Sequence, residues 1–193
     1  MTTQTAHADG GQSRPHHRSG AGHRAQVRPG VAAAGAAVVV ADLDAGNARS
    51  GAEVIEVNLT GSFLCVKAVS TPMREQGAGA IVNLSSATVL SGRPDYLHYV
   101  TSKAGVVGMT RSLARELGPD GITVNAIMPV SVDTGIAHDS ARPEGVERIV
   151  GGQSIKRRLI SDDIVGAAVF LASPGASAIT GQTMVVDGGM NFL

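Results

Sequence analysis

Three side chains in the middle of the sequence have the types and spacing needed for acid–base chemistry. Tyr99 and Lys103 are four residues apart, so on a helix they share one face, with Cβ atoms about 5–6 Å apart. A positive charge beside a phenol stabilises the phenolate and lowers the pKa of the tyrosine from about 10 toward neutral pH. Such a tyrosine can exchange a proton with a substrate oxygen. Ser86, thirteen residues upstream, can donate a hydrogen bond to the same oxygen.

A Tyr–Lys pair at this spacing is also common on solvated helix faces, so the neighbouring segments decide between the two interpretations. Residues 79–86 form a β-branched run that ends in two serines, which predicts a buried parallel strand carrying Ser86 to its carboxyl end. Ligands bind at that edge of open α/β sheets. A second such strand spans 121–129, and we expect Pro129 to stop its pairing.

Strand and helix patterns alternate along the chain, which predicts an α/β fold with a doubly wound parallel sheet. Ser161 is the predicted N-cap of the last helix, whose first turn carries two acidic residues. The predicted strands are Ala37–Ala41, Ala80–Leu84, Ile122–Ile127 and Met184–Val186, and the predicted helices are Leu59–Gln76, Tyr99–Leu117 and Asp162–Leu171.

The composition is that of an ordinary globular domain. The 193 residues are 43% hydrophobic with zero formal net charge, which gives no electrostatic reason to expect binding to nucleic acid or to an anionic membrane. No apolar run approaches the ~20 residues of a bilayer span, and the N-terminus lacks the apolar segment of a signal peptide. The cytoplasm is therefore the expected location. Cys65, the one cysteine, is expected to be a buried structural thiol.

Five segments in this order make the sequence resemble the classical short-chain dehydrogenase/reductase family, from about Val31 to Leu193. The resemblance implies a single Rossmann-like domain over residues 31–193, truncated relative to the full fold. It also implies an oxidoreductase that moves a hydride between NAD(H) and a secondary alcohol or ketone. The five segments are Val57-Asn-Leu-Thr-Gly61, Ile81-Val-Asn-Leu-Ser-Ser86, Tyr99-Val-Thr-Ser-Lys-Ala-Gly105, Ile122-Thr-Val-Asn-Ala-Ile-Met-Pro129 and Thr180-Gly-Gln-Thr-Met-Val-Val-Asp-Gly-Gly189.

The resemblance assigns a role to each of four catalytic candidates. Tyr99 is the implied general acid/base, and Lys103 lowers its pKa and bonds the nicotinamide ribose. Ser86 donates a hydrogen bond to the reacting oxygen, a role that the family spacing assigns to it rather than to Ser85. Asn58 holds a water in the proton relay that refills Tyr99.

The cofactor-binding candidates are Tyr99 and Lys103 together with three residues matched by the resemblance. Asp42 ends the strand at residues 38–42, where a carboxylate accepts the ribose hydroxyls and repels a 2′-phosphate, so NAD is expected rather than NADP. The alternative is that Asp42 begins a polar turn. Val132 and Thr134 match the stretch that binds the carboxamide, although Val130 stands where relatives have glycine and would be strained at a positive φ.

The N-terminal segment 1–30 departs from the family. The glycine-rich phosphate loop is missing, and residues 11–24 are rich in His, Arg and Gly without periodicity, which predicts a disordered basic tail. Alternatively, this segment is frame-shifted, because codons for residues 11–26 read one nucleotide later can encode the missing motif. No Cys or carboxylate lies among the three histidines of residues 11–24, His16, His17 and His23, so no metal site is expected.

A second departure is a gap between Asp42 and Val57, where the family places a helix, a strand, a helix and a further strand. Loss of these strands exposes apolar faces, so we expect reduced stability or rescue by homo-oligomerisation, as a dimer or tetramer. Small residues spaced four apart, Ala104, Gly108 and Ser112, would allow a second helix to approach, within the chain or from another copy. A catalytically inactive remnant of the family is the alternative to an active enzyme.

The substrate class stays open beyond a small-molecule alcohol or ketone. Tyr96, His98 and the segment Ile136–Ile155 are expected to border the pocket, with His98 at its rim. Within that segment, Ala137–Gly152 resembles the mobile lid of the family.

Overall fold

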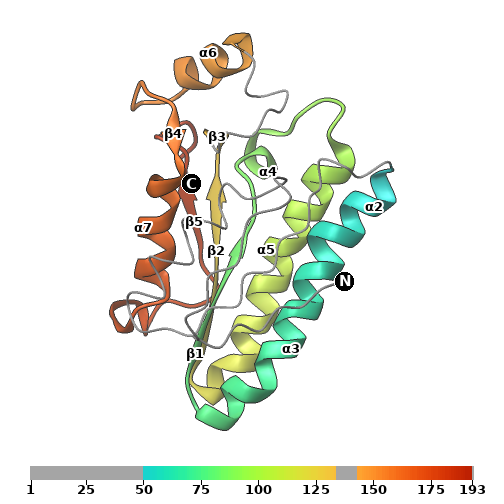
Figure 1. Ribbon diagram of the computed structural model, residues 1–193, viewed down its shortest axis with the longest axis vertical. Coiled ribbons are helices and arrows are strands. Elements are labelled where there is room, and N and C mark those ends of the chain that lie inside the picture. Colours follow the sequence, from blue (N-terminus) through green and yellow to red (C-terminus); the bar gives the residue numbers. More distant parts are fainter. Residues whose placement is uncertain (1–49, 134–142, 193) are drawn as a thin grey trace, which may run out of the picture.

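The computed structural model describes residues 50–133 and 143–192, so the N-terminal segment, the strand predicted at Ala37–Ala41, Asp42 and Thr134 lie outside the described residues. A parallel sheet lies between two layers of helices (Figure 1). Its strands are β1 (Gly79–Leu84), β2 (Ile122–Pro129) and β5 (Thr183–Val186), in the order β1-β2-β5. The predicted doubly wound parallel sheet is confirmed.

One helical layer contains a long helix in three parts, α2 (Gly51–Ile55), the π-helical turn η2 (Glu56–Thr60) and α3 (Gly61–Gln76), which lies beside α5 (Leu97–Leu117). The other layer is α7 (Ser161–Leu171). The remaining elements are α4 (Thr88–Ser91), η3 (Gly118–Asp120), β3 (Val132–Asp133), α6 (Pro143–Gly152), β4 (Leu159–Ile160) and η5 (Pro174–Ala176).

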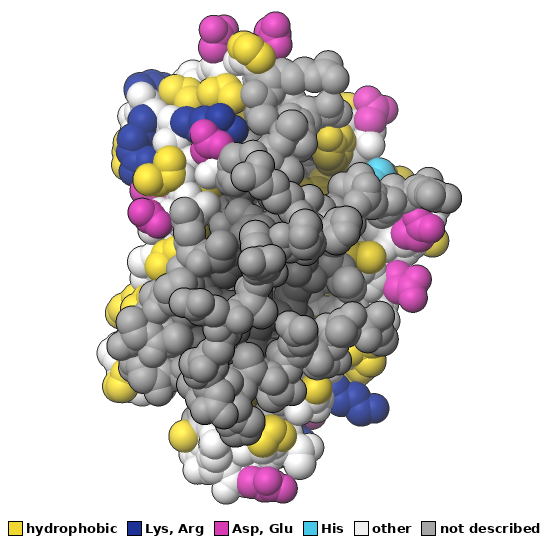
Figure 2. Space-filling view, in the orientation of Figure 1, with side chains coloured by type: hydrophobic (Ala, Val, Ile, Leu, Met, Phe, Trp, Pro, Cys, Tyr) yellow, Lys and Arg dark blue, Asp and Glu magenta, His cyan; other side chains and the backbone are white. Residues whose placement is uncertain are grey.

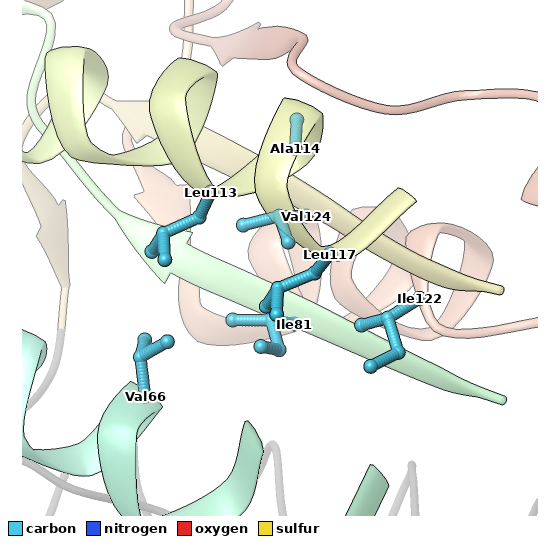
Figure 3. Close-up of a cluster of buried hydrophobic side chains, with 7 residues drawn as sticks. All are labelled: Val66, Ile81, Leu113, Ala114, Leu117, Ile122 and Val124. Carbon is cyan, nitrogen blue, oxygen red and sulfur yellow. The ribbon is translucent and has the colours of Figure 1, made fainter. Parts of the chain in front are cut away.

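The two faces of the sheet bury separate hydrophobic clusters, as expected for a parallel sheet covered on both sides. On the α3 and α5 side, apolar side chains from both helices meet β1 and β2 (Figure 3). That cluster consists of Val66, Ile81, Leu113, Ala114, Leu117, Ile122 and Val124. On the α7 side the cluster consists of Ile127, Val132, Leu159, Ile164, Ala168 and Leu171.

The central strand β2 ends at Pro129, as the segment 121–129 predicts, two residues beyond the range Ile122–Ile127 that was also expected for it. Pro129 is paired with Val186, and the next amide, that of Val130, donates to the Val186 carbonyl at 3.3 Å. Proline lacks an N–H but keeps its carbonyl, and this carbonyl accepts from the Ala87 amide at 2.9 Å. Val130 is not among the described residues with positive φ, and its side chain packs against the α7-side cluster. The strain expected at Val130 is therefore absent.

The start of α7 also differs from the prediction. Ile160, not Ser161, is the N-cap, with extended backbone at φ −116°. Asp163 supplies the capping acceptor, because its Oδ2 accepts from the Ile160 amide at 2.8 Å. Arg157 holds the same carboxylate through two contacts, at 2.8 and 2.6 Å. The Asp163 carboxylate therefore satisfies the amide of the N-cap residue, and its negative charge lies in the first turn, where it is favourable for the helix dipole.

The helix from Gly51 to Gln76 is long and apolar enough to cross a membrane by composition, with a mean hydropathy of 1.2, although no such run was expected. It forms a layer of the domain beside α5 (Figure 1), so we do not assign it as a span. Near β4, basic and acidic side chains lie close together on the surface (Figure 2). Arg158 pairs there with Asp133 at 2.9 Å.

Candidate active site

The carboxyl edge of β1 brings two predicted catalytic side chains together. Ser86 follows β1 and is 7% exposed, while Tyr99 lies in the first turn of α5, which returns past the same edge. The Ser86 side chain lies close enough to the Tyr99 side chain to lower the pKa of the phenol. The Oγ atom of Ser86 also accepts from the amide and the hydroxyl of Thr88, at 3.3 and 3.0 Å. These contacts hold the Ser86 hydroxyl beside the phenol.

The pKa of Tyr99 is raised above its ordinary value, opposite to the direction expected from the sequence. Burial of the phenol is the largest cause, because a low-dielectric surrounding disfavours the phenolate. The nearby Ser86 hydroxyl and the positive charge of Arg93 act in the opposite direction, whereas Tyr96 raises the pKa further. Desolvation therefore outweighs the favourable charges in the chain without a cofactor.

Lys103 lies on the same helix face as Tyr99, as its spacing predicts. Its Nζ atom is 5.8 Å from the centre of the Tyr99 ring and donates to the Leu84 carbonyl at the end of β1, at 3.0 Å. Ser85 has a structural contact instead, since its hydroxyl donates to the Lys103 carbonyl at 2.9 Å. Both contacts attach α5 to the end of β1, which fixes where the Tyr99 turn lies relative to Ser86.

Asn58 reaches the site from the π-helical turn η2. Its Nδ2 atom donates to the Ser102 hydroxyl at 3.0 Å, and that hydroxyl donates to the Tyr99 carbonyl at 2.7 Å. Ser102 is fully buried. A π-helical turn adds a residue to the helical turn, re-aims nearby side chains and is frequent at functional sites. Here it lies where Asn58 bonds to α5 behind the tyrosine.

Two residues expected at the pocket border contact the Tyr99 region. The Tyr96 ring meets the Tyr99 ring edge-on, with centres 6.2 Å apart and an interplanar angle of 87°. The guanidinium carbon of Arg93 lies 3.7 Å from the centre of the Tyr96 ring. His98 lies against the start of α2, where a Cβ on Gly51 would come 3.2 Å from the His98 Cβ.

The cofactor candidates are only partly described. Val132 is buried in β3, paired with Leu159 of β4, just after β2 ends at the sheet edge that carries Ser86. Asp42 and Thr134 lie outside the described residues. Within residues 50–133 and 143–192, no group of three or more His, Cys, Asp or Glu side chains is placed to hold a metal ion. Cys65 is partly buried, and burial raises the pKa of its thiol.

Sequence reasoning missed Arg93 and Ser102. Ser102 is 44 positions from its partner Asn58, so no local spacing could reveal that contact. The one available signal was its place in the turn that contains Tyr99 and Lys103. Arg93 lies in the loop between Ser86 and Tyr99, where an arginine three residues before a tyrosine is too common to single out.

The arrangement can move one proton and stabilise charge on one oxygen. The Tyr99 hydroxyl can give or take the proton, and the Ser86 hydroxyl can bond the same substrate oxygen. Lys103 and Arg93 provide positive charge near the phenol. Charge on an oxygen changes in this way when a carbonyl becomes an alcohol or the reverse.

Comparisons with known proteins cover most of the chain. The sequence model of the family described as enoyl-(acyl carrier protein) reductase matches residues 26–191. The chain is 42% identical over 149 residues to a probable galactose dehydrogenase of Rhizobium meliloti, covering 77% of this chain and 58% of that protein. It is 43% identical over 141 residues to a 3-oxoacyl-[acyl-carrier-protein] reductase of Staphylococcus epidermidis, covering 72% of this chain and 56% of that protein.

A solved structure of another oxidoreductase also resembles this chain. The crystal structure of a 3-oxoacyl-[acyl-carrier protein] reductase from Brucella melitensis, with bound NAD, matches with a TM-score of 0.68 and 34% identity. The match covers 74% of this chain and 52% of that one. The chain therefore spans a little over half the length of the curated relatives it matches.

Proposed function

Because the chain belongs to the classical short-chain dehydrogenase/reductase family and has its Rossmann-like fold in part, we propose that it transfers a hydride between NAD(H) and a secondary alcohol or ketone. The family consists of oxidoreductases, and a matched structure contains NAD. The observation that carries the proposal is the meeting of Ser86, which follows β1, with Tyr99 and Lys103 of α5 at the carboxyl edge of β1.

The proposed reaction assigns one task to each side chain. In reduction, Tyr99 gives its hydroxyl proton to the carbonyl oxygen, and in oxidation it takes the proton from the alcohol. Ser86 donates a hydrogen bond to that oxygen and stabilises its developing charge. Lys103 favours the phenolate form of Tyr99. Asn58, attached to Ser102, holds a water that returns the proton to Tyr99.

We propose that residues at this strand edge hold a nicotinamide cofactor. The Tyr99 hydroxyl and the Lys103 ammonium lie at one strand edge, where they can bond the ribose hydroxyls, and Val132 and Thr134 would bind the carboxamide. Bound NAD supplies or accepts the hydride. Asp42 would accept the adenosine ribose hydroxyls, which favours NAD over NADP.

A catalytically inactive remnant is the second candidate. One observation favours it: burial raises the pKa of Tyr99. We propose in addition that the chain forms a homo-oligomer, acts on a small molecule and resides in the cytoplasm.

Titration with NADH separates the two candidates. We expect saturable enhancement of nicotinamide fluorescence with the purified chain. A Tyr99→Phe variant should retain binding, because the phenyl ring keeps the shape of the site, and should lose turnover. Absence of saturable binding at millimolar NADH would exclude the proposal that the chain is an NAD-dependent oxidoreductase. Full turnover by Tyr99→Phe would exclude Tyr99 as the general acid/base.

A further inference from the structure

We propose that Arg93 is a positioning residue for the reaction, whose guanidinium is held on the ring of Tyr96 and stabilises the phenolate of Tyr99. The inference rests on the proposed function for its catalytic meaning, since it concerns the acid/base group of that site. It assigns a second source of positive charge, independent of Lys103 and supplied by a different element of the structure.

The geometry consists of two aromatic contacts in series. The Arg93 guanidinium lies 3.7 Å from the Tyr96 ring centre, within the range of a cation–π contact. The Tyr96 ring in turn meets Tyr99 edge-on at 6.2 Å. Arg93, Tyr96 and Tyr99 are three residues apart in sequence, and the amide of Tyr96 donates to the Arg93 carbonyl at 3.3 Å. The backbone turn therefore brings the arginine and the ring side by side.

An arginine suits this position because its guanidinium is planar, stacks on aromatic rings and stays charged at every accessible pH. A largely desolvated phenol is sensitive to such a charge, since desolvation disfavours its phenolate. The charge of Arg93 lowers the pKa of Tyr99, against the larger effect of burial. The same positive charge would stabilise Tyr99 while its proton is on the substrate oxygen.

The other groups around Tyr99 do not supply an equivalent charge from the loop side. On its own helix Tyr99 has Lys103, whose Nζ is 5.8 Å from the ring centre and bonded to the Leu84 carbonyl. The neutral neighbours are Ser86 at the end of β1 and Asn58 on η2. The remaining titratable side chains on the described elements packed here are Glu53, Glu56, Asp95, Tyr96 and His98.

The test exploits the composition of the chain, which has two tyrosines and no tryptophan. A Tyr96→Phe background keeps the stacking ring and leaves Tyr99 as the one tyrosine. Growth with a fluorinated tyrosine then places one fluorine label at Tyr99, and fluorination brings the phenol titration to lower pH. Fluorine NMR as a function of pH reports ionisation of Tyr99 without any cofactor or substrate.

In this background, Arg93→Gln is compared with Arg111→Gln, which removes the same charge from an exposed position on the far part of α5. Loss of a charge that acts across one intervening ring should raise the Tyr99 midpoint by about 0.3 to 1 pH unit. Arg111→Gln should leave it unchanged. An unchanged or lowered midpoint in Arg93→Gln, or an equal rise in Arg111→Gln, would overturn the proposal.

Two further variants at position 93 separate the effect of the charge from an effect on folding. If Arg93→Gln does not fold, Arg93→Met keeps an unbranched stem on the Tyr96 ring and should show the same rise. Arg93→Lys keeps the charge and should recover at least part of the original midpoint, whereas a purely structural role for Arg93 predicts no such recovery. Because the titration needs no NADH, a chain that fails to bind NADH contradicts the proposed function and leaves this result intact.

Discussion

At the scale of single residues, the environment of Tyr99 combines opposing effects. Burial raises its pKa, while Ser86 and Arg93 lower it. Tyr99, Lys103 and Ser86 could be identified from the sequence, because Tyr99 and Lys103 share one helix and Ser86 follows the strand before it. The balance between them was not predictable, since desolvation depends on side chains brought in from η2 and from the 92–96 loop. The sign of the pKa shift of Tyr99 is therefore a property of the fold.

Ser102 is predicted to support the site through a contact that sequence spacing does not reveal. Ser102→Ala removes the acceptor of the part-buried Asn58 amide, and leaving such a donor unsatisfied costs about 1 kcal/mol, the lower end of the range for buried groups. We expect the free energy of unfolding in urea to fall by this amount. Ser112→Ala, at an exposed position on the same helix, should change it by less than about 0.5 kcal/mol. Equal effects of the two substitutions would contradict the role given to Ser102.

At the scale of elements, the long helices and strands could be predicted from their hydrophobic periodicity, whereas the π-helical turn and the short elements could not. The strands β1, β2 and β5 and the helices α3, α5 and α7 were predicted because continuous apolar runs and helical spacing are visible in sequence. The π-helical turn η2 was not predicted, because it depends on contacts between its helix and α5. The short elements α4, β3 and β4 have too few residues for a periodic signal.

The start of α7 provides a pH-dependent prediction. Arg157 and the Ile160 amide lower the pKa of Asp163 from 3.8 to about 2. A depressed folded-state pKa adds stability above the unfolded value, and this stability is lost as the pH falls through about 2. Since Arg157 is 51% exposed, we expect Asp163→Asn to cost about 1 kcal/mol at pH 7 after allowance for solvent screening.

Urea unfolding of Asp163→Asn and the parent chain between pH 7 and pH 2 checks this prediction. The difference in unfolding free energy should be constant above pH 4 and should shrink toward pH 2. Asp162→Asn removes the same charge from an exposed neighbour and should show no comparable loss. A difference that grows as the pH falls would contradict the assigned pairing.

At the scale of the whole molecule, β1 is an edge of the sheet among the described residues, since it pairs there with β2 alone. Leu84, at its end, is 43% exposed. The outer faces of α3 and α5 are also exposed, including Ala104, Gly108 and Ser112, and a Cβ on Gly108 would have no neighbour within 4 Å. The homo-oligomer stays a prediction, and these surfaces are where we expect copies of the chain to meet.

Gly108→Arg tests whether that face joins copies of the chain. We expect the parent chain to show the mass of a dimer or tetramer by light scattering after gel filtration, and Gly108→Arg to show the mass of a monomer. Gly166→Arg, on an exposed helical glycine of α7 with no neighbour within 4 Å, is the control and should keep the parent mass. A monomeric parent, or an unchanged mass in Gly108→Arg, would argue against this interface.

The central claim is that this site supports hydride transfer. The most direct test measures whether deuterium moves to a ketone from NADH that is labelled at both C4 positions. With a panel of sugar-derived, acyl thioester and cyclic ketones, we predict that mass spectrometry finds deuterium at the new carbinol carbon of at least one product. The folded Tyr99→Phe variant should transfer none within the same time. Absence of deuterium in every product of the parent chain, or equal transfer by Tyr99→Phe, would contradict the assignment of this site to hydride-transfer chemistry.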